Sequence, residues 1–408
     1  MQRILRGSIC VLVAAVSLSC SDPSGPTPDR SFPSVALGAD QQALGSLVDA
    51  RPAAHASKSL REATSSATDI TYTTIGPDGA PVAATGGVYL PTGTPPAGGW
   101  PVVAFGHGTT GVRPQCAPTL DEGMFQNLPV VLAALKELRA AVVMPDYLGL
   151  GSAGRHPYLN ARSHGNDLLG AVRAARRTGA PLSDRTLLLG ISQGGRATEA
   201  AAELAPTAAP ELRIVANAMA VPALSLQFAP LIADGTLNGA QYSILPQLVS
   251  GAQASYPDMK TSDVLHGTLL AHADEFTKGC AGTAPKPWID PSGPSIGPAD
   301  VRPDGTAESV RASERFLQYL RDNELPQRPN PSIPTLVING TGDELISPRW
   351  TSAAVSRLCA AGVPVEHRER AGGHYAPTDL DDLTAWLFER MSNRAPRSTC
   401  PTGARPAG

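Results

Sequence analysis

Short apolar runs alternate with helix-forming segments along most of the chain. The apolar runs lie at residues 101–105, 140–144, 186–189, 213–221 and 334–339, and a further strand is predicted at residues 365–370. The helix-forming segments lie at residues 130–138, 166–177, 196–204, 351–361 and 380–391. Strands that are apolar on both faces are typical of parallel sheets. The pattern therefore predicts an α/β chain with a mostly parallel sheet covered by helices on both faces.

Two parts of the chain depart from this alternation. Residues 70–75 and 82–90 flank a turn-forming Gly-Pro-Asp-Gly, which predicts an antiparallel hairpin ahead of the parallel strands. Residues 222–312 are rich in Pro, Gly and apolar residues without a clear strand, which predicts a helical lid or cap inserted into the core. The remaining predicted parts are a core at residues 36–221 and 313–400 and a tail at residues 401–408.

The N-terminus has the features of an export signal. Arg3 and Arg6 precede an apolar stretch too short to anchor in a bilayer, and small residues lead up to Cys20. Cys20 stands where a lipoprotein carries its lipid, so both lipidation and simple secretion are open. We predict a signal at residues 1–20 and a flexible tether at residues 21–35, which places the mature chain outside the cytoplasm.

Charge and cysteine content argue against nucleic-acid binding and against a zinc site. A net charge of −3 without a dense basic cluster argues against a nucleic-acid partner. Beyond the signal, an even number of cysteines in an oxidising compartment predicts two disulfides, with three pairings open. These cysteines are Cys116, Cys280, Cys359 and Cys400. A zinc site is the alternative, but the chain has no CxxC pair.

The strongest chemical signal is a serine between two glycines. An apolar run ends at Gly190-Ile191-Ser192-Gln193-Gly194, and a segment of high helix propensity follows. A serine hydroxyl is a poor nucleophile, so it has to project from a sharp strand-to-helix turn toward a base. Such a turn has room only for glycine two residues to either side. The motif predicts the nucleophile elbow of an α/β-hydrolase fold, with Ser192 as the nucleophile.

An acid and a histidine are expected after later strands, in the chain order Ser, Asp or Glu, His. Asp343 follows the apolar run at 334–339, and His374 follows the predicted strand at 365–370, each within a glycine-rich loop. We predict His374 as the general base and Asp343 as the carboxylate that orients it. Glu344 is the alternative acid.

Backbone N–H groups are expected to stabilise the negative oxygen that develops during acyl transfer. One belongs to Gln193, directly after the candidate nucleophile, and the other to Thr109 or Thr110 in the loop after residues 101–105. A second glycine motif at residues 149–154 has the GxGxxG spacing of a dinucleotide site. Because Pro157 falls where the phosphate-binding helix would run, no nucleotide is expected.

On these residues the chain resembles the secretory lipase family of α/β-hydrolases, which includes lipase A-type triacylglycerol lipases. The motifs are Cys116-Ala117-Pro118, Met144-Pro145-Asp146-Tyr147-Leu148-Gly149, Gly190 to Gly195, Ala209-Pro210-Glu211-Leu212 and Gly342-Asp343-Glu344-Leu345-Ile346, together with His374. Two features depart from the fungal members: Gln193 after the serine, and His107-Gly108-Thr109-Thr110 before the cysteine. These departures bear on the preferred acyl chain length.

The resemblance implies a helical lid formed by the insertion and an oxyanion donor at Thr110 rather than Thr109. It implies a catalytic triad of Ser192, Asp343 and His374. It also implies two disulfides, Cys116–Cys280 and Cys359–Cys400.

The resulting hypothesis is an exported serine ester hydrolase, lipase-like, that cleaves acylglycerols or other lipid esters through an acyl-enzyme. It needs no metal or cofactor, and a lipid–water interface is the surface on which such an enzyme would act. The alternatives are an esterase for short acyl or aryl esters of small molecules or polymers, an exported peptidase, and an inactive binding protein of the same fold. The last requires a missing triad member, whereas all three residues are present.

Overall fold

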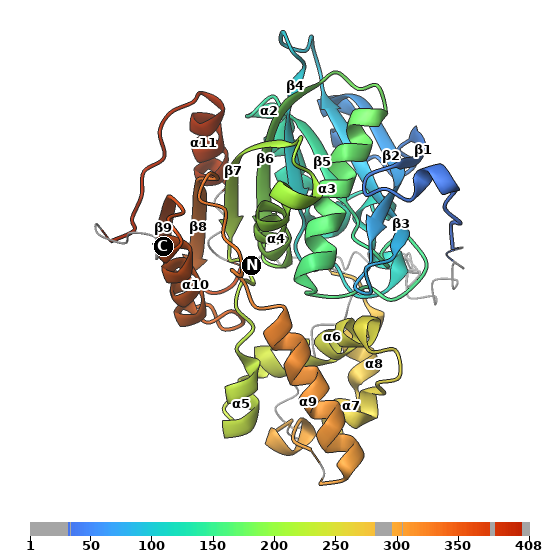
Figure 1. The fold of residues 1–408 in the computed structure, drawn as a ribbon, viewed down its shortest axis with the longest axis vertical. Helices are drawn as coiled ribbons and strands as arrows, with labels where there is room; N and C mark the ends of the chain where they lie inside the picture. The colour runs from blue at the N-terminus through green and yellow to red at the C-terminus, as the bar shows by residue number, and fades with distance from the viewer. Residues whose placement is uncertain (1–31, 33, 282–295, 304, 376–379, 402–408) are drawn as a thin grey trace, which may run out of the picture. The chain divides into compact units, whose positions relative to one another are not determined.

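A computed structural model of the chain describes residues 32, 34–281, 296–303, 305–375 and 380–401. The predicted signal at residues 1–20, nearly all of the tether at 21–35 and residues 402–408 of the tail lie outside the described residues. The described part contains one sheet of nine strands, in the order β1-β2-β3-β5-β4-β6-β7-β8-β9 (Figure 1).

The sheet is antiparallel at one end and parallel over the rest. β1, β2 and β3 pair antiparallel, β3 also pairs antiparallel with β5, and every later pairing from β5 to β9 is parallel. The strands are β1 (Leu47–Pro52), β2 (Thr64–Ile75), β3 (Pro81–Pro91), β4 (Trp100–Gly106), β5 (Ala141–Pro145), β6 (Leu182–Ile191), β7 (Arg213–Ala220), β8 (Thr335–Gly340) and β9 (Val365–Arg370). The predicted mostly parallel sheet and its leading hairpin, β2 and β3, are therefore confirmed.

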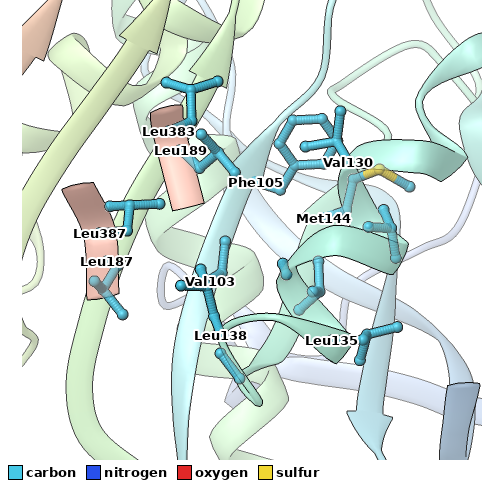
Figure 2. Packing of buried hydrophobic residues seen from close by; sticks show 14 of the residues in the cluster. Val103, Phe105, Val130, Leu135, Leu138, Met144, Leu187, Leu189, Leu383 and Leu387 are labelled. Atoms are coloured by element: carbon cyan, nitrogen blue, oxygen red, sulfur yellow. The ribbon is translucent and has the colours of Figure 1, made fainter. Parts of the chain in front are cut away.

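Helices cover both faces of the sheet, as predicted. They are α1 (Lys58–Ala63), α2 (Leu128–Lys136), α3 (Ala161–Arg177), α4 (Gln193–Ala208), α10 (Pro348–Ala360) and α11 (Leu380–Met391). Strand β4 shows the two-sided burial: Val103 and Phe105 pack with α2 and α11 (Figure 2), whereas Val102 and Ala104 pack with α3 and α4. Successive side chains of a strand point to opposite faces. A fully apolar strand therefore contributes to two separate cores.

Five further helices of the described chain lie between β7 and β8. They are α5 (Phe228–Asp234), α6 (Gly239–Ser255), α7 (Gly267–Ala271), α8 (Ala273–Lys278) and α9 (Ala307–Asp322). Short 3₁₀ turns occur at Ala39–Gln41, Pro114–Cys116, Pro118–Leu120, Met124–Gln126, Thr261–Asp263 and Pro298–Asp300. We call residues 222–323 the helical insertion. Its helices bury their own apolar cluster, which includes Leu245, Leu265 and Phe316.

The insertion is longer than the sequence indicates. Helix α9 runs across residue 312, where the return to the core was expected, and its Phe316 and Leu320 are buried in the insertion's own cluster. Both ends of the insertion are held beside the core. The buried Arg196 of α4 donates hydrogen bonds to the carbonyls of Leu224 and Asn323.

Candidate active site

Ser192 occupies a sharp turn between β6 and α4. Its backbone has φ 53° and ψ −112°, a conformation that residues with side chains rarely adopt. The turn is held by hydrogen bonds from the Ser192 N–H to the Ala220 carbonyl (2.9 Å) and from the Ala223 N–H to the Ser192 carbonyl (3.1 Å). Strained backbone that is fixed by its surroundings is common at functional sites.

Two glycines make this turn sterically feasible. A Cβ atom on Gly194 would lie 1.8 Å from the Gly106 carbonyl oxygen, and a Cβ on Gly190 would lie 2.3 Å from the Gly194 carbonyl oxygen. Both distances are far inside van der Waals contact. The close approach of the β4, β6 and α4 backbones therefore explains the glycine pattern around Ser192.

The structure brings Ser192, His374 and Asp343 together. The Ser192 Oγ lies 2.9 Å from His374 Nε2, and His374 Nδ1 lies 2.8 Å from Asp343 Oδ2. Asp343 lies just after β8 and His374 just after β9, so the two loops meet at the carboxyl ends of neighbouring parallel strands. The His374 and Asp343 side chains are 3% and 1% exposed.

Hydrogen bonds fix the direction of proton transfer. Asp343 Oδ1 accepts the backbone N–H groups of Leu345 (2.9 Å) and Ile346 (2.8 Å), which leaves Oδ2 for the imidazole. A carboxylate facing Nδ1 favours the tautomer with its proton there, so Nε2 presents a lone pair to the Ser192 hydroxyl. This is the arrangement in which a histidine removes the serine proton.

Glu344, the alternative acid, contacts a different atom. Its Oε2 accepts the backbone N–H of His374 at 3.2 Å, and its side chain does not reach the imidazole through any hydrogen bond among the described residues. A Cβ on Gly373 would lie 2.6 Å from that oxygen, so glycine is needed there for the carboxylate to approach. Glu344 thus holds the loop that carries His374.

The predicted oxyanion loop follows β4. The Thr109 Oγ1 lies 2.8 Å from the hydroxyl of Tyr158, and the Thr110 carbonyl accepts the N–H of Ala281 (2.8 Å). Within the described residues, the backbone N–H groups of Thr109, Thr110 and Gln193 donate no hydrogen bond. No acceptor within the described residues competes for these N–H groups, which stay the predicted oxyanion donors.

The structure contains the two disulfides that the family resemblance implies. Cys116 pairs with Cys280 and Cys359 with Cys400, with Cα–Cα separations of 5.1 and 5.5 Å. The first ties the segment after the oxyanion loop to the helical insertion. Because all four cysteines are paired, none is left as a thiolate for zinc. Among the described residues, no group of three or more His, Cys, Asp or Glu is arranged to hold a metal ion.

A buried polar cluster beside Ser192 was not found by sequence reasoning. The Gln193 side-chain amide contacts the imidazoles of His156 and His164, at 2.9 and 3.0 Å. Burial lowers the pKa of His156 to about 3 and that of His164 well below its usual value. His156 and Pro157 entered the sequence analysis only as the interruption of a glycine motif. That motif lies in the loop before α3, a helix that begins only at Ala161.

The chain is similar to known lipases and esterases. The family model for secretory lipases matches residues 124–399. Lipase A of Arthroderma benhamiae is 28% identical over 68% of this chain and 59% of its own length. The trichothecene C-3 esterase of Fusarium sporotrichioides is 26% identical over 62% of this chain and 57% of its own length. The chain thus spans a little under three fifths of the length of these curated relatives.

Solved structures share the fold. Candida antarctica lipase A in its closed state matches with a TM-score of 0.70 and 18% identity, over 90% of this chain and 86% of that one. The rice cell wall degrading esterase LipA from Xanthomonas oryzae matches with a TM-score of 0.62 and 22% identity, over 86% and 95% of the two chains. The helices of the described part include none long and apolar enough to cross a bilayer. With the family model spanning well over half of its residues, the chain belongs to the secretory lipase family.

Proposed function

We propose that the protein is an exported serine hydrolase of carboxylic esters, with lipid esters as its main substrates. The observation that carries the proposal is the continuous hydrogen-bonded path from the Ser192 hydroxyl through His374 to the Asp343 carboxylate, at 2.9 and 2.8 Å. An inactive binding protein would have no need of the strained turn at Ser192 or of a buried carboxylate paired with an imidazole.

The mechanism follows from the tautomer of His374 that carries its proton on Nδ1. His374 Nε2 takes the proton as the Ser192 Oγ attacks the ester carbonyl, and the tetrahedral oxyanion is bound by the N–H of Gln193 and that of Thr110. The imidazolium, stabilised by Asp343, then protonates the departing alcohol, and an acyl-serine remains. Water adds by the same steps, which releases the acid and regenerates the serine hydroxyl.

The helical insertion is proposed as the acyl-binding lid. Its cluster is strongly apolar, and it extends to Ile346 and Trp350 beside the loop of Asp343, where Phe228 meets Trp350 edge to face at 5.2 Å between ring centroids. Apolar side chains adjoining a triad suit a fatty acyl chain, because affinity for such a chain grows with the apolar area that it buries.

A short-chain or aryl esterase is the second candidate. It is favoured by the likeness to an esterase that acts on trichothecenes and by the structural likeness to an esterase that degrades plant cell wall. The two candidates share the chemistry and differ only in the acyl pocket. We also propose that residues 1–20 direct export, with Cys20 as the lipid-carrying residue if the chain is anchored.

A chain-length series tests the proposal. Hydrolysis of p-nitrophenyl acetate, butyrate, octanoate and palmitate is measured with the wild type and Ser192→Ala. We expect Ser192→Ala to be inactive on all four and the wild type to prefer the longer chains. A preference for acetate or butyrate would select the esterase, and equal rates for the two proteins would refute serine catalysis.

A further inference from the structure

Gln193 carries out a second task with its side chain. Its backbone N–H is one proposed oxyanion donor, while its side chain is buried at 1% exposure. The amide nitrogen lies 2.9 Å from His156 Nε2 and 3.0 Å from His164 Nε2. Both imidazoles are fully buried. Two buried imidazoles therefore hold the side chain of the residue that follows the nucleophile.

The surrounding backbone fixes which atoms donate. His156 Nδ1 lies 2.8 Å from the Leu148 carbonyl oxygen, which can only accept, so Nδ1 carries the proton and Nε2 is a lone pair. His164 Nε2 accepts the backbone N–H of Leu159 at 3.2 Å, so it is a lone pair as well. Two acceptors therefore face the amide: the Gln193 NH₂ group donates to His156 Nε2 and shares the lone pair of His164 Nε2 with the Leu159 N–H. The orientation of the amide follows from this network.

The two imidazoles pack against each other and against a tyrosine ring. Their rings stack with centroids 5.2 Å apart and planes 12° apart, and the Tyr147 ring stacks on His164 at 4.6 Å. Burial lowers the pKa of both histidines, so both stay neutral at neutral pH. A protonated ring would direct an N–H toward the amide N–H. The neutral state is the one that can hold Gln193.

The same stretch of chain also contacts the other side of the oxyanion hole. Two residues after His156, the Tyr158 hydroxyl lies 2.8 Å from Thr109 Oγ1 in the oxyanion loop. The Tyr158 carbonyl accepts the hydroxyl of Tyr319 in α9 at 2.6 Å, so the segment is itself held by the helical insertion. His156 and Tyr158 thus reach the two backbone segments that supply the proposed oxyanion donors.

We propose that His156, Tyr158 and His164 form a brace that positions the oxyanion hole by holding Gln193 and Thr109. The inference rests on the proposed ester hydrolysis. The three are positioning residues, because they act through the backbone of Gln193 and the loop of Thr109 rather than on substrate. The oxyanion forms only in the transition state, so a loosened brace lowers kcat and leaves KM nearly unchanged.

The test compares Gln193→Met, Tyr158→Phe and the control Thr198→Val with the wild type. Methionine keeps the length of the glutamine side chain and removes its hydrogen bonds, and phenylalanine removes a single hydroxyl. Thr198 is a buried residue of the same helix whose hydroxyl donates to the Gly195 carbonyl at 3.1 Å, outside the brace. Measured values are kcat and KM for p-nitrophenyl butyrate and the inhibition constant of phenylboronic acid, whose tetrahedral serine adduct places an oxygen in the oxyanion hole.

We expect kcat to fall about 10- to 100-fold in Gln193→Met, several-fold less in Tyr158→Phe, and not in Thr198→Val, with KM within about 2-fold throughout. The inhibition constant should rise in parallel with the loss of kcat. If the wild type is active but Gln193→Met and Tyr158→Phe keep its kcat, the brace is overturned and the proposed function stands. The same holds if the control Thr198→Val loses as much kcat as the two brace variants. A wild type that neither hydrolyses the ester nor binds the boronic acid overturns the proposed function together with the brace.

Discussion

Replacing Asp343 by Asn tests which of two adjacent acids orients the catalytic imidazole. Asp343 Oδ2 lies 2.8 Å from His374 Nδ1, and Oδ1 accepts two backbone N–H groups. An asparagine fits the same space, and its oxygen can keep the two backbone hydrogen bonds. Its NH₂ group then faces Nδ1, which must present a lone pair. The His374 proton moves to Nε2. That nitrogen can then no longer accept the proton of Ser192.

The expected loss is large because nothing replaces the buried charge. The Asp343 side chain is 1% exposed, so water cannot solvate the imidazolium in its place. The same substitution in a Ser-His-Asp triad costs about 10⁴-fold in kcat. That factor corresponds to about 5.5 kcal/mol of transition-state stabilisation.

Glu344→Gln is the matched control. The glutamine oxygen can still accept the His374 N–H that Glu344 Oε2 now accepts at 3.2 Å, and only the charge is lost. Because this carboxylate is exposed and contacts backbone rather than imidazole, we expect kcat within about 3-fold of the wild type.

Steady-state hydrolysis of p-nitrophenyl butyrate between pH 6 and 9 gives kcat and KM for both variants, and thermal melts check that they fold. A Glu344→Gln variant that loses several orders of magnitude in kcat, beside an Asp343→Asn variant that keeps its activity, would refute the assignment and make Glu344 the acid.

Three further predictions follow from individual contacts. The double variant Cys116→Ser, Cys280→Ser releases the segment after the oxyanion loop from the helical insertion. Denaturant melts should show a loss of about 2–5 kcal/mol in the free energy of unfolding, and assays should show a lower kcat. An unchanged melt and an unchanged kcat would contradict this. Gly194→Ala places a methyl group 1.8 Å from the Gly106 oxygen, so the soluble protein should be inactive, and wild-type kcat would speak against the elbow geometry. Burial raises the pKa of Glu199 to about 8, so the folded state retains a proton that the unfolded state releases near pH 4.5. The contribution of Glu199 to the free energy of unfolding therefore falls by about 1 kcal/mol per unit as pH rises between these values. Glu199→Gln should flatten that slope in melts from pH 5 to 8, and parallel slopes would argue against a buried neutral acid.

Three strands of the parallel part of the sheet, β4, β5 and β8, were predictable because they are buried on both faces. β4, β5 and β8 read as unbroken apolar runs, and their observed bounds lie within two residues of the predicted ones. β1 was not predicted, because this edge strand is largely exposed and lacks an apolar pattern. Helix α3 begins at Ala161, earlier than its apolar residues indicate, because the Asn160 side chain accepts the Ser163 N–H.

The site residues also fall into those that the local sequence indicates and those that it does not. Ser192, Asp343 and His374 each follow a strand in a glycine-rich loop, so local sequence was sufficient to nominate them. His156, Tyr158 and His164 carry no such signal, because their contacts with Gln193 and Thr109 exist only after the β5–α3 loop folds against the elbow. A histidine followed by proline in a loop gives no local reason to expect contact with a catalytic turn.

If the Ser192 hydroxyl is an activated nucleophile, a reagent specific for such serines labels it covalently. The folded protein is treated with a fluorophosphonate, digested and mapped by mass spectrometry. We expect one adduct on the peptide that contains Ser192, with no labelling of Ser192→Ala and strongly slowed labelling of His374→Ala. An unlabelled wild type, or an adduct on another residue that persists in Ser192→Ala, would contradict it.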